Sequence, residues 1–290
     1  MTHAHVTAPT QYVQASGIRF AYRRFGQDKG VPLVLMPHYR AGMDHWDPAV
    51  TDGLAASRPV ILFDNAGIAA SSGKTPNTME EMADHAADFV GALGLSLIDV
   101  LGFSIGGYIA QTFALRHPDM VRRLMLVGTG PRGGEPASDP NIRKWADLTD
   151  AQTGESPLES FLYLFFRPSE TSQAAGKAFW DRRHLRKNDV DPPSSSQAMA
   201  AQTAAIIAWR EVRGERYAEL SEITQPTLVV NGSHDLMVPT INAYNLSQQI
   251  PRAQLIIYPD SGHGSLFQFP ELFVAHGRMF LDGSIWGAYS

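Results

Sequence analysis

Residues 98–107 read IDVLGFSIGG, a short apolar run that ends in a glycine-flanked serine, and this stretch decides the fold. The run is too short for a helix and is typical of a buried strand, whereas the residues after Ser104 have helical spacing. A serine on such a sharp strand-to-helix turn has a strained backbone, so its neighbours two positions away must be small. Gly102 and Gly106 meet that need. We predict that Ser104 is a nucleophile and that the N–H of Ile105 stabilises an oxyanion. The competing interpretation is a helix-capping serine beside a glycine-rich turn.

A serine hydroxyl needs a base within hydrogen-bond reach, and one histidine of the chain has the right context. His263, in DSGHGS at 260–265, follows the last expected strand, and parallel sheets build their sites in such loops. Asp235, in NGSHD at 231–235, follows the preceding strand and is predicted to orient the imidazole. The chain order Ser, Asp, His, with spacings of 131 (235 − 104) and 28 (263 − 235), favours this assignment. Asp260 is an alternative acid that lies too close to His263 in sequence, and a surface-loop histidine is the alternative for His263.

The loop after the first buried strand, PHYRAG at 37–42, is predicted to supply a second oxyanion donor. The donor is the backbone N–H of Tyr39 or, alternatively, that of Arg40. His38 either ties this loop down through side-chain hydrogen bonds or contacts the substrate, and the Arg40 side chain is a further candidate substrate contact. His38 and the nearby His45 do not have a metal-ligand spacing, so no metal site is expected.

Short apolar runs recur along the chain and alternate with longer segments of helical spacing. Six runs have the length and composition of strands that are buried on both faces of a parallel sheet: 33–36, 60–63, 98–103, 124–127, 227–230 and 255–258. Two segments before them, 12–15 and 18–22, predict an antiparallel hairpin at the sheet edge. Helical spacing is found in three segments: 79–93, 104–116 and 266–280. This order predicts an α/β fold with a mostly parallel, eight-stranded sheet and helices on both faces.

The pattern changes after the sixth strand, where no buried-strand signal occurs and large apolar side chains accumulate. We interpret this region as an inserted helical cap. The predicted organisation is a core of residues 1–130 and 223–282, a cap of residues 131–222 and a C-terminal tail of residues 283–290. Most cap aromatics are expected to fill a helical core, and a few to face a pocket. The candidates for substrate contact are Phe165, Trp180 and Trp209.

The composition limits the classes of protein to which this chain can belong. It has 290 residues, 44% hydrophobic and 18% charged, which is globular and not disordered. The net charge of −5, without a basic stripe, argues against nucleic-acid binding. The absence of cysteine excludes disulfides and thiolate sites. No apolar run spans a bilayer and the N-terminus lacks the features of a signal peptide, so we expect a cytoplasmic protein that does not bind membranes. Homo-oligomerisation stays open.

Several motifs of the sequence together resemble those of a known protein family. The chain resembles the α/β-hydrolase superfamily and is similar to its small cofactor-free haloperoxidases, esterases and lactonases. The motifs that carry the resemblance are Pro37-His38, FDNAG at 63–67, the Ser104 turn, NGSHD at 231–235, Gly262-His263 and FPELF at 269–273. The resemblance covers about two-thirds of the chain and implies a Ser–His–Asp triad, no cofactor and a cap that selects the substrate.

The sequence departs from the family pattern in two loops. Tyr39 stands where the family often has a glycine after the histidine. A side chain at this position narrows the entrance of the expected active site. The stretch 65–71 lacks an arginine that is usually a structural anchor. Because the nucleophile is serine and not aspartate, the reactions of haloalkane dehalogenases and epoxide hydrolases do not carry over.

Three functions follow as hypotheses. The leading one is hydrolysis of a small to medium carboxylic ester or lactone through an acyl-enzyme on Ser104. The second is carbon–carbon bond hydrolysis of a vinylogous diketone, for which Arg40, Arg143 and Arg167 are candidates to bind a carboxylate. The third is a non-catalytic ligand-binding protein on the same fold, which an intact triad disfavours because binding alone does not need all three residues.

Overall fold

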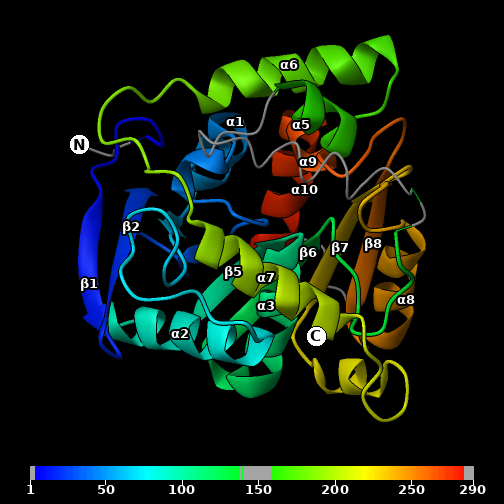
Figure 1. Ribbon diagram of the computed structural model, residues 1–290, viewed down its shortest axis with the longest axis horizontal. Helices are drawn as coiled ribbons and strands as arrows, with labels where there is room; N and C mark the ends of the chain where they lie inside the picture. Colours follow the sequence, from blue (N-terminus) through cyan, green and yellow to red (C-terminus); the bar gives the residue numbers. More distant parts are fainter. Residues whose placement is uncertain (1–3, 138, 140–157, 284–290) are drawn as a thin grey trace.

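The computed structural model describes residues 4–137, 139 and 158–283. A single eight-stranded sheet crosses the middle of the molecule (Figure 1). Its strands are β1 (Gln11–Ala15), β2 (Ile18–Gly26), β3 (Leu33–Met36), β4 (Pro59–Phe63), β5 (Ile98–Phe103), β6 (Val121–Val127), β7 (Thr227–Gly232) and β8 (Ala253–Tyr258).

The strand order in the sheet is β1-β2-β4-β3-β5-β6-β7-β8. β1 pairs antiparallel with β2, and β2 pairs antiparallel with β4, whereas every other pair is parallel. The predicted mostly parallel sheet with an edge hairpin is therefore confirmed. Because β3, β5, β6, β7 and β8 are parallel neighbours, the loops at their carboxyl ends all leave from one edge of the sheet.

Nine α-helices are found in the described ranges: α1 (Pro48–Ala55), α2 (Met79–Ala92), α3 (Ile105–Arg116), α5 (Leu158–Phe165), α6 (Glu170–Arg183), α7 (Ser196–Trp209), α8 (Ile241–Gln249), α9 (Ser265–Gln268) and α10 (Pro270–Leu281). Three short 3-10 helices accompany them: η1 (Met43–His45), η2 (Pro118–Met120) and η3 (Ala218–Glu222). None of the described helices is long and apolar enough to span a bilayer.

The sequence predicts a final helix over 266–280, with Pro270 near its start or at a kink. The structure has two helices, α9 and α10, separated at Phe269, with Pro270 at the start of the longer one. The break follows from Pro270, which has no N–H to donate and restricts the residue before it, and which therefore begins a new helix.

The apolar core has one half on each face of the sheet. Val34 and Met36 of β3 point into a cluster with α2, α3 and α8, and Leu33 and Leu35 point into a cluster with α1, α9 and α10. This alternation is the period of two that a strand imposes on its side chains. The second cluster continues into aromatic side chains of α5 and α6, so these helices share a core with the sheet.

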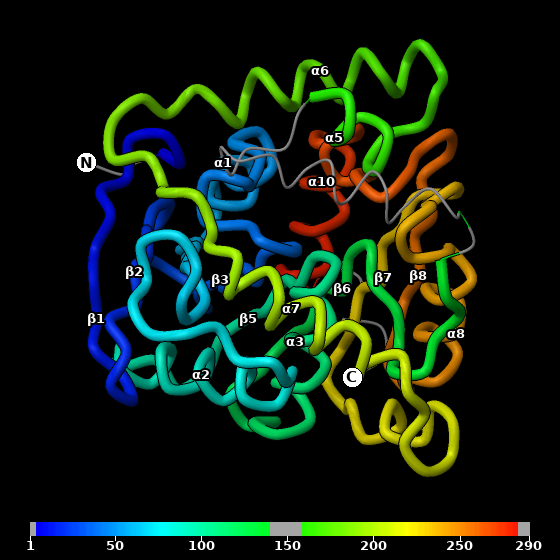
Figure 2. The backbone as a smooth tube through the Cα atoms, in the orientation of Figure 1, coloured from blue at the N-terminus to red at the C-terminus, as the bar shows by residue number. Residues whose placement is uncertain are grey.

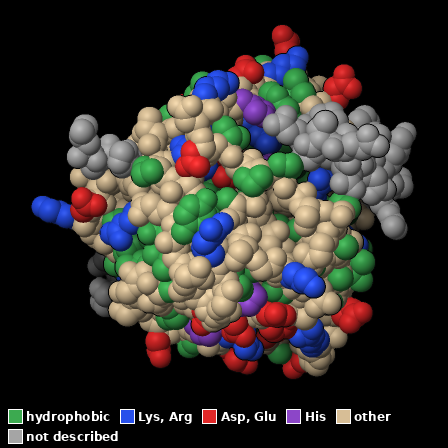
Figure 3. Space-filling view, turned by 60° about the vertical axis from the view of Figure 1, so that its left-hand side comes forward, with side chains coloured by type: hydrophobic (Ala, Val, Ile, Leu, Met, Phe, Trp, Pro, Cys, Tyr) green, Lys and Arg blue, Asp and Glu red, His purple; other side chains and the backbone are tan. Residues whose placement is uncertain are grey.

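Helices α5, α6 and α7, together with η3, lie between β6 and β7 in sequence. The tube in Figure 2 shows α6 along one edge of the molecule, and α7 lies against α3. The boundaries of the cap stay a prediction, because residues 140–157 and, in the predicted tail, residues 284–290 lie outside the described part of the chain. On the face drawn in Figure 3, lysine and arginine side chains are interspersed with aspartate and glutamate.

Candidate active site

Ser104 occupies the sharp turn between β5 and α3 that the sequence predicts. Its backbone has φ 58° and ψ −122°, a conformation that a residue with a Cβ rarely adopts. Glycine is required on both sides: a Cβ at Gly102 would lie 2.3 Å from the Gly106 carbonyl oxygen, and one at Gly106 would lie 2.0 Å from Met36 O. The Thr129 hydroxyl donates to Ser104 O over 2.9 Å and holds the turn from β6. The strained turn is therefore fixed by its neighbours on two sides.

His263 and Asp235 meet in a fully buried hydrogen bond. His263 Nδ1 lies 2.8 Å from Asp235 Oδ2, and neither side chain has exposed surface. The other carboxylate oxygen, Oδ1, accepts the N–H groups of Met237 and Val238, each at 2.9 Å. These two bonds to the turn after β7 fix the carboxylate so that Oδ2 faces the imidazole. A carboxylate can only accept, so Nδ1 carries the hydrogen and Nε2 has the lone pair of a base.

Among the described residues, no hydrogen bond joins His263, the predicted base, to Ser104. The ring of His263 lies 5.0 Å, centroid to centroid, from the ring of Phe103, which precedes Ser104. His263 Nε2 is buried and has no partner among the described residues. In enzymes without substrate, hydrogen bonds between nucleophile and base are often long and tighten when substrate binds.

The loop after β3 packs directly on the serine turn, as the contact of Gly106 with Met36 shows. Ala41 N donates to His38 O over 3.1 Å and closes a tight turn at 38–41. The N–H of Arg40 donates to Gln202 Oε1 of α7 over 2.7 Å, so the alternative oxyanion donor of the sequence analysis is already engaged. Tyr39 stays the predicted donor, together with Ile105, whose N–H opens α3, where the first N–H groups have no intrahelical acceptor.

His38 is brought to the site as a neutral side chain. Its ring lies 5.5 Å from Phe103 and 5.3 Å from Phe165. Burial lowers the pKa of His38 to about 3, and the positive charge of Arg183 acts in the same direction. Nδ1 lies 3.1 Å from the carbonyl oxygen of Tyr39, which can only accept, so this nitrogen carries the hydrogen. His38 thus ties its own loop down, as the sequence predicts for its structural role.

The three aromatic residues that are predicted to contact the substrate lie at different distances from His263. Phe165 reaches the site: its ring lies 5.2 Å from His263, and its carbonyl accepts the N–H of Gly264 over 2.8 Å. Trp180 lies one ring further out, 5.5 Å from Phe161, which stacks on Phe165 at 4.2 Å. In the described part of the chain, no group of three histidine, aspartate or glutamate side chains has the geometry of a metal site.

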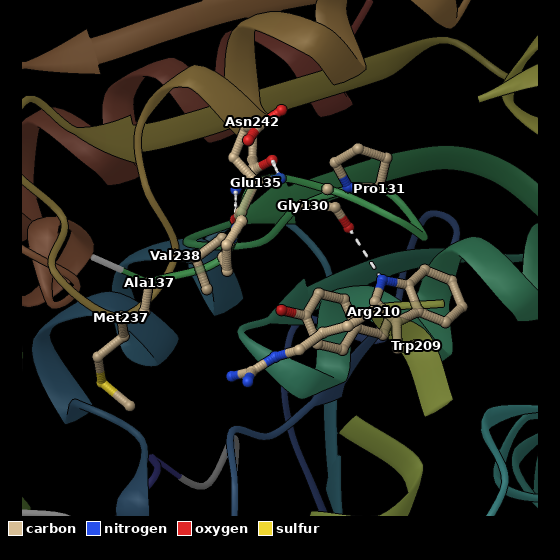
Figure 4. A pocket seen from close by; sticks show the side chains of 12 residues that line it. Gly130, Pro131, Glu135, Ala137, Trp209, Arg210, Met237, Val238 and Asn242 are labelled. Carbon is tan, nitrogen blue, oxygen red and sulfur yellow. Dashed lines mark hydrogen bonds between the residues drawn. The ribbon is translucent and has the colours of Figure 1, made fainter. Parts of the chain in front are cut away.

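Trp209 lines a different space, a small pocket behind the acid of the site. It stacks on Tyr108 at 5.0 Å and donates to Gly130 O over 3.4 Å (Figure 4). Met237 and Val238, the residues that bind Asp235, form another wall of this pocket. Its volume of about 30 Å³ holds one or two water molecules.

The sequence did not point to several residues that build the site. Gln202 lies in an alanine-rich helix and Thr129 in a loop of small residues, and neither position carries a motif. Their roles come from contacts across more than 20 residues of sequence, which no local pattern encodes.

Comparison with known proteins agrees with the fold. Residues 32–270 match the family model for the alpha/beta hydrolase fold. An alpha/beta hydrolase fold protein from Chitinophaga pinensis is 41% identical, with coverage of 97% of this chain and 99% of that chain and a TM-score of 0.88. A thermophilic esterase from Thermogutta terrifontis is 26% identical, with coverage of 95% and 98% and a TM-score of 0.72.

Two relatives are named for an enzymatic activity. The pimeloyl-[acyl-carrier protein] methyl ester esterase of Nitrosomonas europaea is 29% identical, over 85% of this chain and 94% of its own length. A putative carbamate hydrolase of Caulobacter is 27% identical, over 82% and 85%. The sheet and these matches define an enzyme of the hydrolase class. The chain belongs to the α/β-hydrolase family, and the resemblance found in the sequence is confirmed.

Proposed function

We propose that this protein hydrolyses a small to medium carboxylic ester or lactone through an acyl-enzyme on Ser104. The observation that carries the proposal is the buried 2.8 Å bond between His263 Nδ1 and Asp235 Oδ2, which leaves His263 Nε2 as an unpartnered base. The strained backbone of Ser104, next to the ring that packs on His263, supports the assignment of the nucleophile.

In the acylation step, Ser104 Oγ attacks the carbonyl carbon and its proton passes to His263 Nε2. The carbonyl oxygen becomes an oxyanion that accepts the N–H groups of Tyr39 and Ile105. Asp235 stabilises the imidazolium and is not itself protonated. As the tetrahedral intermediate collapses, the bond to the leaving alcohol breaks and His263 gives this alcohol its proton. In a lactone, the alcohol stays attached to the acyl group.

In the deacylation step, water attacks the acyl carbon and gives a proton to His263 Nε2. The bond between the acyl carbon and Ser104 Oγ then breaks, and the proton returns to the serine. The products are a carboxylic acid and the free enzyme. General base catalysis typically contributes about 10² to 10⁴-fold, and one oxyanion donor about 10² to 10³-fold.

The names of two relatives support an acyl substrate with a heteroatom leaving group, whereas a third relative is named 2-hydroxymuconate semialdehyde hydrolase. One relative is named for a methyl ester and another for a carbamate. Carbon–carbon hydrolysis has less support, because Arg167, a candidate for binding a substrate carboxylate, lies 3.6 Å from Asp260. Arg143 lies outside the described residues, and the hydrogen bonds of the Arg40 backbone to the cap do not involve its guanidinium.

The test combines turnover with covalent labelling. We expect the wild-type protein to hydrolyse p-nitrophenyl butyrate or a simple lactone, and Ser104→Ala to lose this activity at an unchanged melting temperature. A fluorophosphonate probe should label Ser104, as located by mass spectrometry, and His263→Ala should abolish the labelling. Folded protein that is neither labelled nor active would favour the ligand-binding hypothesis. Turnover of a vinylogous diketone without ester turnover would favour carbon–carbon hydrolysis.

A further inference from the structure

The turn that carries the proposed second oxyanion donor is held from outside the core by the cap residues 194–203. Arg40, in this turn, has φ 62°, a left-handed conformation that residues with a Cβ rarely adopt. Its N–H donates to Gln202 Oε1 over 2.7 Å, and its carbonyl accepts the Ser194 hydroxyl over 2.7 Å. Both backbone polar groups of the strained residue are therefore bound by cap side chains.

The neighbouring residue is bound by the same cap segment. The hydroxyl of Tyr39 lies 2.9 Å from Thr203 Oγ1 and 3.3 Å from the carbonyl oxygen of Met199. Gln202 is 1% exposed, so its amide is shielded from water that would compete for Arg40 N–H. These contacts thus form a junction between residues 194–203 and the loop after β3, with the Gln202 side chain buried in it.

This junction controls the direction of the Tyr39 N–H. A trans peptide points its C=O and N–H in opposite directions, and the turn holds the His38 carbonyl toward Ala41 N over 3.1 Å. If Arg40 left its left-handed conformation, the turn would open and the preceding peptide would rotate. The N–H of Tyr39 would then leave the position that an oxyanion occupies.

We infer that Gln202, assisted by Ser194, is a positioning residue that holds the strained Arg40 turn and so completes the oxyanion site from the cap. This inference rests on the proposed function, because it concerns the donor of the acyl-transfer step. It makes the cap a part of the catalytic apparatus in addition to its role over the substrate.

The same helix provides a matched control. Gln197 of α7 makes an equivalent contact with the core: its Oε1 accepts Thr75 N over 3.2 Å and its Nε2 donates to Thr75 O over 3.0 Å. The loop that contains Thr75 follows β4 and does not carry an oxyanion donor. Loss of the Gln197 contact therefore loosens the cap without touching the Arg40 turn.

The experiment compares Gln202→Met, which keeps the size of the side chain, with Gln202→Glu, which keeps an acceptor oxygen, and with Gln197→Met. For p-nitrophenyl butyrate, we expect Gln202→Met to lower kcat by about 10 to 100-fold with KM changed by less than about 3-fold. The affinity for a boronic acid, whose serine adduct places an oxygen at the oxyanion position, should fall in parallel with kcat. Gln202→Glu should return to within about 5-fold of wild type, and Gln197→Met to within about 2-fold.

Several results would overturn the inference. They are a wild-type kcat in Gln202→Met, an equal loss in Gln197→Met, or a rise in KM alone. If Gln202→Met does not fold, Ser194→Ala removes one bond from the same turn and should still lower kcat by about 3 to 10-fold. A wild-type protein that neither turns over the ester nor binds the boronic acid would overturn the proposed function as well. If the wild-type protein is active and neither Gln202→Met nor Ser194→Ala changes its kcat, this inference alone is overturned.

Discussion

Replacing Gly106 by alanine should damage catalysis and folding together, because the added Cβ would meet the loop after β3. It would lie 2.0 Å from Met36 O and 2.7 Å from Pro37 O, whereas ordinary van der Waals contacts begin near 3.4 Å. Relief therefore needs a displacement of about 1.4 Å (3.4 − 2.0) between the serine turn and this loop. Backbone atoms on both sides leave no flexible side chain to absorb the movement.

The size of the two effects follows from that displacement. A misplacement of about 1 Å near reacting groups costs about 10²-fold, and loss of one oxyanion donor costs about 10² to 10³-fold. We therefore expect kcat to decrease by about 10² to 10³-fold. Overpacking costs about 1–3 kcal/mol of unfolding free energy, and each kcal/mol lowers Tm by about 2–4 °C in chains slightly shorter than this one. A fall of about 2–12 °C in Tm is therefore expected.

The assay is kcat for p-nitrophenyl butyrate together with Tm from circular dichroism, with two glycine controls. Gly91→Ala, in α2, adds a Cβ that meets nothing within 4 Å and should leave kcat unchanged while raising stability by about 0.5–1 kcal/mol. Gly26→Ala has φ 90° and a Cβ 2.5 Å from Arg58 O, away from the site, so it should lower Tm but not kcat. If Gly106→Ala lowered Tm but left kcat unchanged, as we expect for Gly26→Ala, the coupling between this loop and the chemistry would be refuted.

Three further predictions concern the nucleophile, one buried histidine and one buried ion cluster. Ser104→Ala should lower kcat by at least about 10³-fold in ester assays with little change in Tm, and substantial residual turnover would contradict the assignment. Burial lowers the pKa of His5 from 6.5 to about 4. The neutral imidazole therefore stabilises the fold above pH 6.5, and this contribution of about 3 kcal/mol is lost as the pH falls toward 4. In denaturant titrations, the free energy of unfolding of His5→Gln should depend less on pH than that of the wild type. Arg23→Leu should cost about 3–5 kcal/mol because it removes the buried cation that bonds to both Asp44 and Asp191 and leaves Asp44 with only the more distant Arg186, 3.8 Å away; a cost below about 1 kcal/mol would argue against this cluster as a stabilising unit.

Much of the fold could be predicted because the strands carry their own signal. Runs such as 98–103 and 227–230 are buried on both faces of a parallel sheet, so most positions in them are apolar or small, and each run is visible without tertiary information even though the first contains the charged Asp99. Two helices, α1 and α8, were not expected. Half of the side chains of α8 are polar, and its N-cap Thr240 does not cap the helix with its side chain, because the hydroxyl donates to Gly232 O over 2.6 Å. The local signals for this helix are therefore weak, and its packing on β7 and β8 compensates for them.

The candidate residues at the ends of strands were also accessible from sequence, since strand ends on one edge of a parallel sheet must be neighbours. The structure brings His263 and Asp235 together as that rule requires. The role of α7 was not accessible. A glutamine in a helix has many possible partners, and the choice of Arg40 depends on how the cap lies on the sheet, which no local pattern fixes.

The proposed mechanism assigns different chemistry to two histidines, His38 and His263, that lie beside the same Phe103 ring. His38 bonds to a neutral carbonyl, so nothing compensates a positive charge there, and burial lowers its pKa to about 3. His263 bonds to the Asp235 carboxylate, whose charge is held in place by two backbone N–H groups. In the proposed mechanism, a proton taken from Ser104 is therefore stabilised on His263 and not on His38. The partner of each Nδ1, and not burial alone, decides which imidazole can act as the base.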